Sequence, residues 1–429
     1  MRARGASWAY ADEATAVVCW RRPLDCSGVA PASRPLLYAA GGVRSFVIGF
    51  TGVALGLYLA ALGYDPALVG GVVASGLAGN AVGVALVAGL GERLGRRRTL
   101  IGATVLCAAG LGALAAAPAA PSVVGLAAFL GMVNGMGRDR GPAQALEQSV
   151  LADATSDEHR TAAFVRYTFV QDVLGACGSL AAAVPTVVQH QFGLALVDAY
   201  RASLSSAALL SLVSVLLYAR LPAAVGRAAA ASPPARLSPE SRRRVAGLSG
   251  LFALDSLGGG FIAGSILSYW FFRRFGLGGE ALGPMFFAAK CLNAGSYFAA
   301  EALARRLGLV RTMVYTHLPT SVILLALPFL PTASLAIALF LVREAFVQMD
   351  VPARQSYVAA VTAPGERTAA LALTSLARNV GWAAGPGLAG VTMTAFGLGA
   401  PLVAGAVVKA VYDVALYVSY RGVRPPEEH

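Results

Sequence analysis

Long apolar stretches separated by short polar loops dominate the pattern of hydrophobic and polar positions along this chain. A helix of about 20 apolar residues crosses a lipid bilayer, and on that measure the chain holds about twelve spans. The pattern therefore predicts an all-α membrane protein with six spans in each half. The expected spans are Leu36–Leu62, Leu68–Leu90, Leu100–Ala117, Val123–Gly137, Thr161–Val188, Leu196–Leu217, Ala246–Phe272, Ala281–Leu303, Thr312–Leu330, Ala333–Val351, Thr368–Ala395 and Ala400–Tyr420.

The two halves of the chain repeat one another at a nearly constant offset. Asn80, Gly95 and Thr99 return 213 residues later as Asn293, Gly308 and Thr312. The set Arg160-Thr161-Ala162-Ala163, Asp172 and Gly178 returns 207 residues later as Arg367-Thr368-Ala369-Ala370, Asn379 and Gly385. Duplicated halves, each with a basic loop between apolar helices, are typical of membrane transporters.

The repeat divides the chain into five segments. We expect an N-terminal tail at 1–35, a six-helix bundle at 36–220, a cytoplasmic linker at 221–244, a second six-helix bundle at 245–420 and a C-terminal tail at 421–429. The linker is rich in Ala, Pro, Ser and Arg, a composition typical of flexible connections.

Composition supports a membrane protein, because 57% of the residues are hydrophobic and the mean hydropathy is +0.65. Only 13% are charged, whereas a soluble domain averages about 25%. The net charge of +12 comes from arginines concentrated in alternate loops, which the positive-inside rule explains without nucleic acid. The rule places both termini of this multi-pass protein in the cytoplasm, and we expect it in the plasma (inner) membrane.

Enzyme motifs are missing from the sequence. There is no GxxxxGK[ST] segment for nucleotide binding and no HExxH segment for zinc. The five cysteines form no CxxC pair and no regular spacing, which argues against a zinc site or a disulfide framework. We therefore expect no enzyme activity, no metal and no cofactor.

The loop after the second predicted span resembles a signature of the major facilitator superfamily, G-x-x-x-D-R-x-G-R-R. The loop reads Glu92-Arg93-Leu94-Gly95-Arg96-Arg97, with Ala88 in place of the first glycine and Glu92 in place of the aspartate. The resemblance covers about residues 36–420. It implies a fold of two pseudo-symmetric six-helix bundles, in which spans one, four, seven and ten line a central cavity.

A finer resemblance is carried by Asp350-Val351-Pro352-Ala353-Arg354-Gln355, followed by Glu366-Arg367-Thr368-Ala369-Ala370. These segments are similar to uncharacterised bacterial members related to drug and sugar efflux permeases. Two efflux-associated signatures are degraded. Gly131 replaces an arginine in the fourth span, with Arg343 as its counterpart in the tenth. Gly175 and Gly178 lack the proline that their twin Gly385-Pro386-Gly387 retains.

The resemblance also implies a gating role for the basic loops, carried by Glu92, Arg93, Gly95, Arg96, Arg97, Arg305 and Gly308. Glu92 and Arg93, held by the turn at Gly95, would pair with helix ends of the other half while the cytoplasmic side is closed. Pairs made in only one state bias an equilibrium between two states. The alternative is a purely topological anchor.

Charged and polar residues inside the predicted spans are the candidates for a substrate or proton pathway: Asp172, Asp255, Lys290, Arg343, Glu344, Arg378 and Asn379. A charge at the bilayer centre costs about 2.5–3.5 kcal/mol, so each needs a function or a partner. Asp255 would carry a proton, or would be stabilised by the start of its helix. Arg343 and Glu344 point about 100° apart, so we expect that they do not easily satisfy each other.

Asp172 and Asn379 occupy matching places in spans five and eleven, with Arg378 beside Asn379. They would bind cargo at the membrane midplane, or hold one conformation through a salt bridge between the halves. Lys290 would neutralise an anionic substrate or pair with a carboxylate, and pairing is favoured.

Three further features have simpler expected roles. Lys409 and Asp413 are four residues apart and would neutralise each other on span twelve. Arg44 would anchor the cytoplasmic end of span one. Four tyrosines are expected to face the cavity: Tyr58, Tyr167, Tyr269 and Tyr357.

These features predict a secondary transporter that moves a small organic molecule by alternating access, with proton-coupled efflux as the leading hypothesis. Uptake of a sugar or another metabolite is the alternative within transport. A non-transporting membrane receptor or scaffold on the same fold is the alternative outside it. The expected partners are a small-molecule substrate, a proton or another ion, and the lipid bilayer, with no nucleic acid. The protein is expected to be a monomer.

Overall fold

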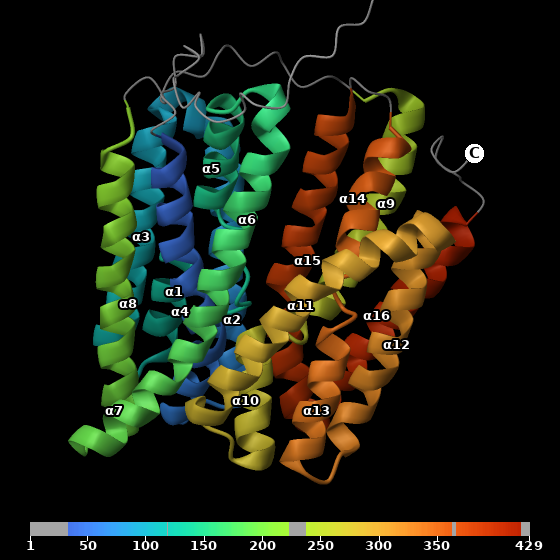
Figure 1. Ribbon diagram of the computed structural model, residues 1–429. Helices are drawn as coiled ribbons and strands as arrows, with labels where there is room; N and C mark the ends of the chain where they lie inside the picture. Colours follow the sequence, from blue (N-terminus) through green and yellow to red (C-terminus); the bar gives the residue numbers. More distant parts are fainter. Residues whose placement is uncertain (1–32, 118, 223–236, 363–365, 422–429) are drawn as a thin grey trace, which may run out of the picture.

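The computed structural model describes residues 33–117, 119–222, 237–362 and 366–421, in which all regular elements are helices (Figure 1). The first half contains α1 (Ser33–Ala61), α2 (Pro66–Leu94), α3 (Arg96–Ala116), α4 (Pro121–Leu130), α5 (Pro142–Asp153), α6 (Asp157–Leu180), α7 (Val184–Phe192) and α8 (Leu196–Ala219). The second half contains α9 (Pro239–Gly260), α10 (Gly264–Phe275), α11 (Gly279–Leu307), α12 (Leu309–Ala326), α13 (Ala333–Glu344), α14 (Asp350–Ala360), α15 (Arg367–Phe396) and α16 (Ala400–Tyr420). Each predicted span overlaps one helix or two consecutive helices, and the predicted all-α fold is confirmed.

Two helices begin inside segments that the sequence assigned to the tail and to the linker. α1 begins at Ser33, inside the expected N-terminal tail, and α9 begins at Pro239, inside the expected linker. The Ser238 hydroxyl accepts a hydrogen bond from the Ser241 N–H and caps α9, and proline is favoured at the position that follows a cap. Residues 1–32, 223–236 and 422–429 of the predicted tails and linker lie outside the described part of the chain.

Eight segments of the described chain are long and apolar enough to cross a membrane: α1, α2, α3, α6 with α7, α8, α9 with α10, α12 and α16. The other four predicted spans are shorter or carry charge. The fourth and tenth are divided into short helices, and α11 and α15 carry Lys290 and Arg378 in their middles. The interrupted and charged spans are those that surround the cavity described below.

The fourth span is broken between α4 and α5, where the sequence predicted one helix followed by a long cytoplasmic loop. Residues 131–141 form turns, with Gly137 at φ +78° and Met132 at φ +49°. The left-handed backbone at Gly137 suits a residue without Cβ. Gly52 packs directly on it, since a Cβ on Gly52 would lie 2.2 Å from the Gly137 Cα. The tenth span is broken in the same region, between α13 and α14.

The duplication in sequence is also a duplication in packing. In the first half α1 packs on α6, where a Cβ on Gly178 would meet the Phe46 carbonyl oxygen at 1.9 Å. In the second half α9 packs on α15, and a Cβ on Gly385 would meet the Leu257 carbonyl oxygen at 2.8 Å. Gly385 follows Gly178 by 207 residues and Leu257 follows Phe46 by 211. Glycine is therefore needed at the same crossing in both halves.

The described residues of the two halves pack most closely toward one end of the molecule. We call the end where α1 begins and α16 ends the terminal face, and the opposite end the distal face. Close contacts between the halves lie toward the distal face: Gly56 with Ser265, Gly70 with Pro386, and Gly279 with Ala182. In Figure 1 the two groups of helices approach each other at the lower, distal end.

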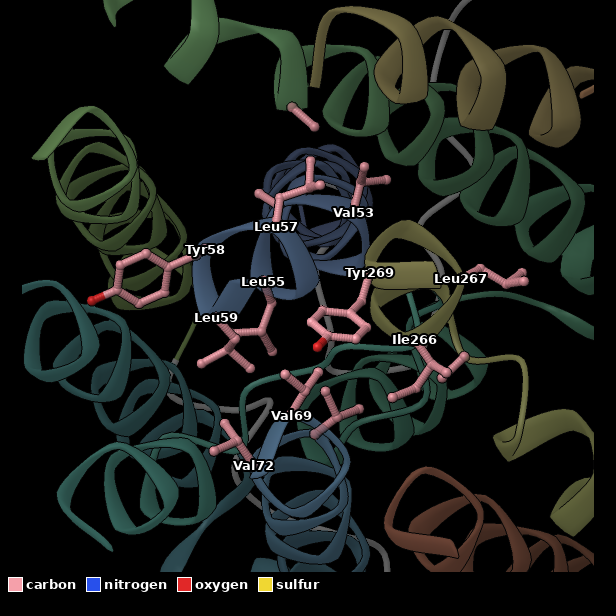
Figure 2. Close-up of a cluster of buried hydrophobic side chains, with 14 of the residues drawn as sticks. Val53, Leu55, Leu57, Tyr58, Leu59, Val69, Val72, Ile266, Leu267 and Tyr269 are labelled. Atoms are coloured by element: carbon pink, nitrogen blue, oxygen red, sulfur yellow. The ribbon is translucent and has the colours of Figure 1, made fainter. Parts of the chain in front are cut away.

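The hydrophobic core follows the same division. One cluster toward the distal face draws residues from both halves, whereas two clusters toward the terminal face each belong to a single half. Figure 2 shows part of the shared cluster, with Tyr269 of α10 beside Leu55 of α1 and Val69 of α2. The Tyr269 hydroxyl donates to the Tyr64 carbonyl at 3.2 Å. This shared core closes the distal face.

Candidate functional site

A polar cavity lies between the two halves and extends toward the terminal face. Its larger part has a volume of about 710 Å³ and is bordered mainly by α5, α6, α11, α14 and α15. A smaller part of about 140 Å³ lies between α1, α9, α10, α13 and α16. Lys290, Arg354 and Arg378 line both parts, which therefore form one space. Sites for small organic molecules commonly have volumes of about 300–1,000 Å³.

Asp255 stands at the centre of a buried charge cluster in the second half. Its Oδ1 accepts a hydrogen bond from Lys409 Nζ at 2.7 Å, and its Oδ2 lies 3.4 Å from Arg354 Nη1. Arg354 also bonds Asp350, one turn earlier on α14, at 2.7 Å. Asp255 lies in the last turns of α9, so the alternative of stabilisation by the start of its helix was wrong. Cationic side chains stabilise the carboxylate instead.

His317 of α12 extends this cluster to α16. Its Nε2 lies 3.3 Å from Lys409 Nζ, and its Nδ1 lies 2.9 Å from Asp413 Oδ1. Because an ammonium group can only donate, Nε2 accepts, and the ring proton sits on Nδ1 facing Asp413. The prediction that Lys409 and Asp413 neutralise each other along their helix was wrong, since each bonds His317 on α12. A helical spacing of four permits contact but does not outweigh better partners on neighbouring helices.

A second buried cluster surrounds Arg44 in the first half. The guanidinium bonds Asp139 at 2.6 Å and Glu147 at 2.5 Å. The Glu147 carboxylate also accepts from the hydroxyls of Tyr167 and Tyr218, and its side chain is fully buried. The expectation that Arg44 anchors the end of span one was wrong, because α5, inside a predicted loop, brings Glu147 to it.

The two clusters occupy equivalent places with the charges exchanged. Asp255 follows Arg44 by 211 residues, and Arg354 follows Glu147 by 207. The alignment of the two halves at this point is supported independently by Thr155 and Thr362, which are also 207 residues apart. The hydroxyl of each donates to the carbonyl oxygen four residues earlier. Each half thus joins its first helix to the second part of its broken helix by a buried ion pair of opposite polarity.

Arg343 and Glu344 form a pair that the sequence did not predict. Arg343 Nη1 bonds Glu344 Oε1 at 2.5 Å, and Glu344 Oε2 accepts from Asn293 Nδ2 of α11 at 2.8 Å. The angle of about 100° applies to the directions in which the two side chains leave the helix. Long side chains can bend back and meet beyond that point, which is why the expectation was wrong.

Lys290 does not pair with a carboxylate among the described residues. Its Nζ donates to the carbonyl oxygens of Gly137 at 2.8 Å and Gly175 at 3.0 Å. Gly137 lies in the break of the fourth span, where carbonyl groups are released from helical hydrogen bonds. Asp172 of α6 lines the same cavity and interacts electrostatically with Lys290 and Arg138. The favoured prediction for Lys290, a direct ion pair, was therefore wrong.

Trp382 holds two arginines from different halves. The Arg140 guanidinium lies 3.8 Å from the ring centroid and the Arg378 guanidinium lies 4.6 Å from it. Such cation–π contacts hold the positive charge at the cavity wall without neutralising it. Asn379, predicted as a partner of Asp172 across the midplane, lines the same cavity.

The basic loops of the two halves have the same backbone conformation. Gly95 and Gly308 have φ angles of +84° and +82°, and the hydroxyls of Thr99 and Thr312 bond their carbonyl oxygens. Two arginines of the first loop bond within their own half: Arg96 to Asp153 of α5, and Arg97 to the Ala219 carbonyl of α8. Arg93 is exposed, and the side chains of Glu92 and Arg305 lie outside the described part.

The four tyrosines expected at the cavity are buried in hydrophobic clusters instead. The aromatic residues that line the cavity are Phe252, Phe286, Phe340 and Trp382. Sequence reasoning also missed His317, Glu147 and Trp382, which stand alone in the sequence without a motif. The one available signal was the offset of 211 that relates Arg44 to Asp255.

Among the described residues no group of three or more His, Cys, Asp or Glu side chains is arranged to hold a metal ion. Two packed halves that close one face and leave a polar cavity toward the other define a membrane transporter. The model of the Major Facilitator Superfamily matches residues 37–347, and the chain belongs to that superfamily. It is therefore a secondary transporter of small molecules and not an enzyme.

The chain is similar to a yeast membrane protein in sequence and to several solved transporters in structure. The uncharacterized membrane protein YJR124C of Saccharomyces cerevisiae is 22% identical over 393 residues, covering 83% of this chain and 87% of the yeast protein. The nucleoside transporter NupG has a TM-score of 0.68 at 14% identity, over 91% of this chain and 98% of its own. A POT family peptide transporter has a TM-score of 0.71 at 12% identity, over 92% of this chain and 98% of its own. The D-xylose-proton symporter has a TM-score of 0.66 at 14% identity, over 90% of this chain and 97% of its own.

Proposed function

We propose that this protein couples the export of a small organic molecule to the movement of protons. The observation that carries the proposal is the continuous contact from Asp413 through His317 and Lys409 to Asp255. Three of these residues, His317, Lys409 and Asp255, line the cavity. A proton taken up in the cluster therefore acts directly on the cavity wall.

Asp413 and His317 are the groups that would hold the proton. Asp413 Oδ2 is buried and has no hydrogen-bond partner in the described structure, while Oδ1 is bonded to His317. A buried carboxylate oxygen without a donor is costly, and protonation removes that cost. A proton added to His317 Nε2 would instead break the contact with Lys409 and place two cations side by side.

The charges around Asp255 make its pairing sensitive to such a change. It is faced by Lys409 and Asp413 from α16, His317 from α12, Arg354 and Asp350 from α14, and Arg378 from α15. Repulsion from a protonated His317 would drive Lys409 toward Asp255 and weaken the hold of Arg354 on it. Because Arg354 belongs to α14 at the terminal face, the shape of the cavity would change with it.

The orientation of the protein in the membrane would set the direction of transport. The positive-inside rule assigns the terminal face to the cytoplasm, so the cavity would load cargo from inside the cell. The resemblance of the segment at Asp350 to members related to drug and sugar efflux permeases supports export by an antiport mechanism in the plasma membrane. The basic loops would then act as the gate, with Glu92 and Arg93 pairing across the halves when the terminal face closes.

The proposal is tested in liposomes that contain the purified protein and a pH-sensitive dye. Pools of compounds are added under a proton gradient in each direction, for wild type, Asp255→Asn and the control Asp198→Asn, whose carboxylate is exposed beside Arg201. We expect compound-dependent proton flux that Asp255→Asn abolishes and Asp198→Asn retains. Proton movement in the same direction as the cargo would instead establish uptake. Silence across all pools from folded protein would favour a receptor or scaffold.

A further inference from the structure

We propose that the central cavity is an anion-binding site, and that the cargo carries a carboxylate or phosphate group held by Arg138, Lys290 and Arg378. The inference rests on the proposed function in one respect, since it takes the cavity as the place where cargo binds. It adds the chemical class of the cargo. The balance of charges on the cavity wall supports it.

Half of the charged side chains that line the described cavity are bonded to one another. The bonded pairs are Arg343 with Glu344, Arg354 with Asp350, and Lys409 with Asp255, and Asp139 is bonded to Arg44 behind the wall. Within each pair the opposite charges largely cancel, whereas Arg44 is shared between Asp139 and the buried Glu147. The balance therefore depends on the charged residues that remain.

Three cations remain without a direct carboxylate partner in the described structure. Lys290 bonds two carbonyl oxygens, which leaves one of the three ammonium donors. Arg378 stacks on Trp382, and its buried Nε has no hydrogen-bond partner. The Arg138 side chain makes no hydrogen bond or ion pair with a described residue. All three line the larger part of the cavity.

One described acidic side chain in the same part of the cavity partly offsets the charge of these three cations. Asp172 lines the same part of the cavity and is exposed, so it offsets one positive charge within reach of Arg138 and Lys290. Cations drawn out of bulk water are stabilised by an anion that bonds to them.

The three cations come from both halves of the protein. Arg138 lies in the break of the fourth span, whereas Lys290 and Arg378 belong to α11 and α15. An anion between them would attract both halves toward the centre of the cavity. Cargo would therefore relieve the repulsion between like charges that otherwise opposes closing of the terminal face.

The test measures the sign of the potential in the cavity, and it works before the cargo is identified. A single cysteine is placed at Ser375, which is exposed and lines the cavity, after the five native cysteines are replaced by alanine. A second protein carries the cysteine at the exposed Phe192 of α7 as reference. Both are labelled in phosphatidylcholine nanodiscs with a sulfonate and a trimethylammonium methanethiosulfonate reagent of similar size.

We expect the ratio of anionic to cationic labelling rates to be at least about tenfold higher at position 375 than at position 192, because a charged cleft concentrates counterions. Arg138→Gln and Arg378→Gln should each lower that ratio at least about threefold. Arg201→Gln removes the same charge from the distal face and should leave the ratio unchanged. Excess benzoate or phenyl phosphate should slow labelling, and benzyl alcohol should not.

Equal ratios at the two positions, or a ratio that neither arginine variant changes, would overturn the proposal. Protection by added phosphatidylglycerol and by neither soluble anion would overturn the assignment to a soluble cargo. The labelling rates do not depend on proton movement. A failure of proton coupling would therefore leave this result standing, and a failure here would leave the coupling test unaffected.

Discussion

Lys409 Nζ lies 2.7 Å from Asp255 Oδ1, and this bond joins α16 to α9 across a buried interface. Both residues are buried, with 5% of Lys409 and 4% of Asp255 exposed. Span twelve was not among the spans expected to line the cavity, yet Lys409 reaches the cavity wall. The bond therefore connects α12 and α16, through His317 and Lys409, to the wall of the cavity.

Removing Lys409 should destabilise the protein because the Asp255 carboxylate would lose its closest cation. We expect Lys409→Met to lower the free energy of unfolding by about 3–5 kcal/mol, the usual result of breaking a buried pair from one side. Thermal unfolding in detergent measures the change. The double variant Lys409→Met with Asp255→Asn should recover most of the loss, and a double variant that is no better than the single one would contradict the pairing.

His317 should be required for proton coupling more than for cargo exchange. We expect His317→Gln to reduce proton-driven flux at least about tenfold, since glutamine keeps a polar side chain but cannot take up a proton. Exchange of cargo across the membrane without a gradient should persist. His190→Gln, at the exposed end of α7, is the matched control. Equal proton-driven flux and an unchanged pH profile in the two variants would rule out His317 as a proton carrier.

Two adjacent glycines of α2 should respond very differently to the same substitution. A Cβ on Gly70 would lie 2.3 Å from the Pro386 carbonyl oxygen of the other half, whereas a Cβ on Gly71 meets nothing within 4 Å. Gly70→Ala should therefore open the distal face. A cysteine at the buried Ser268 would report this by reacting with a water-soluble maleimide at least about tenfold faster than in wild type. Labelling of Gly71→Ala should match wild type, and equal rates in all three would contradict the closed distal face.

Glu366, in the loop before α15, should give a small dependence of stability on pH. Hydrogen bonds from Ser241 and from Ser238 lower the pKa of this carboxyl below its usual 4.5. A lowered pKa in the folded state means that the ionised form stabilises the fold above about pH 4.5 and that this contribution disappears as the pH falls through the lowered value. Glu366→Gln should lower the melting temperature by about 1 °C at pH 7 and by less at pH 4. An equal difference at both pH values would contradict this.

The apolar segments were predictable from the sequence because long hydrophobic runs have one structural outcome in a bilayer. The breaks in the fourth and tenth spans were not predictable in the same way. α5 and α14 lie in segments rich in charge, and those charges looked like loop positions until partners for Glu147 and Arg354 were visible. A glycine permits a break such as the one at Gly137, but the sequence does not indicate at which glycine a break will form.

The candidate site was predicted in its residues better than in its contacts. Asp255, Lys290, Arg378 and Asn379 all line the cavity, although only span seven, which carries Asp255, was among the spans expected there. Partners were mostly misassigned, because pairing is decided by packing between helices that lie far apart in the sequence. His317 follows that rule: an isolated histidine in an apolar span gives no sign that it faces both Lys409 and Asp413.

The most direct test of proton coupling is accumulation of an identified cargo in inverted vesicles, under a proton gradient that is then collapsed with a protonophore. Wild type should concentrate the cargo against its own gradient and lose it when the protonophore is added. Asp255→Asn should equilibrate the cargo without concentrating it, because the carboxylate that links protonation of His317 and Asp413 to Arg354 is missing while the cavity remains. Accumulation by Asp255→Asn at the wild-type level would contradict the claim that this cluster couples protons to transport.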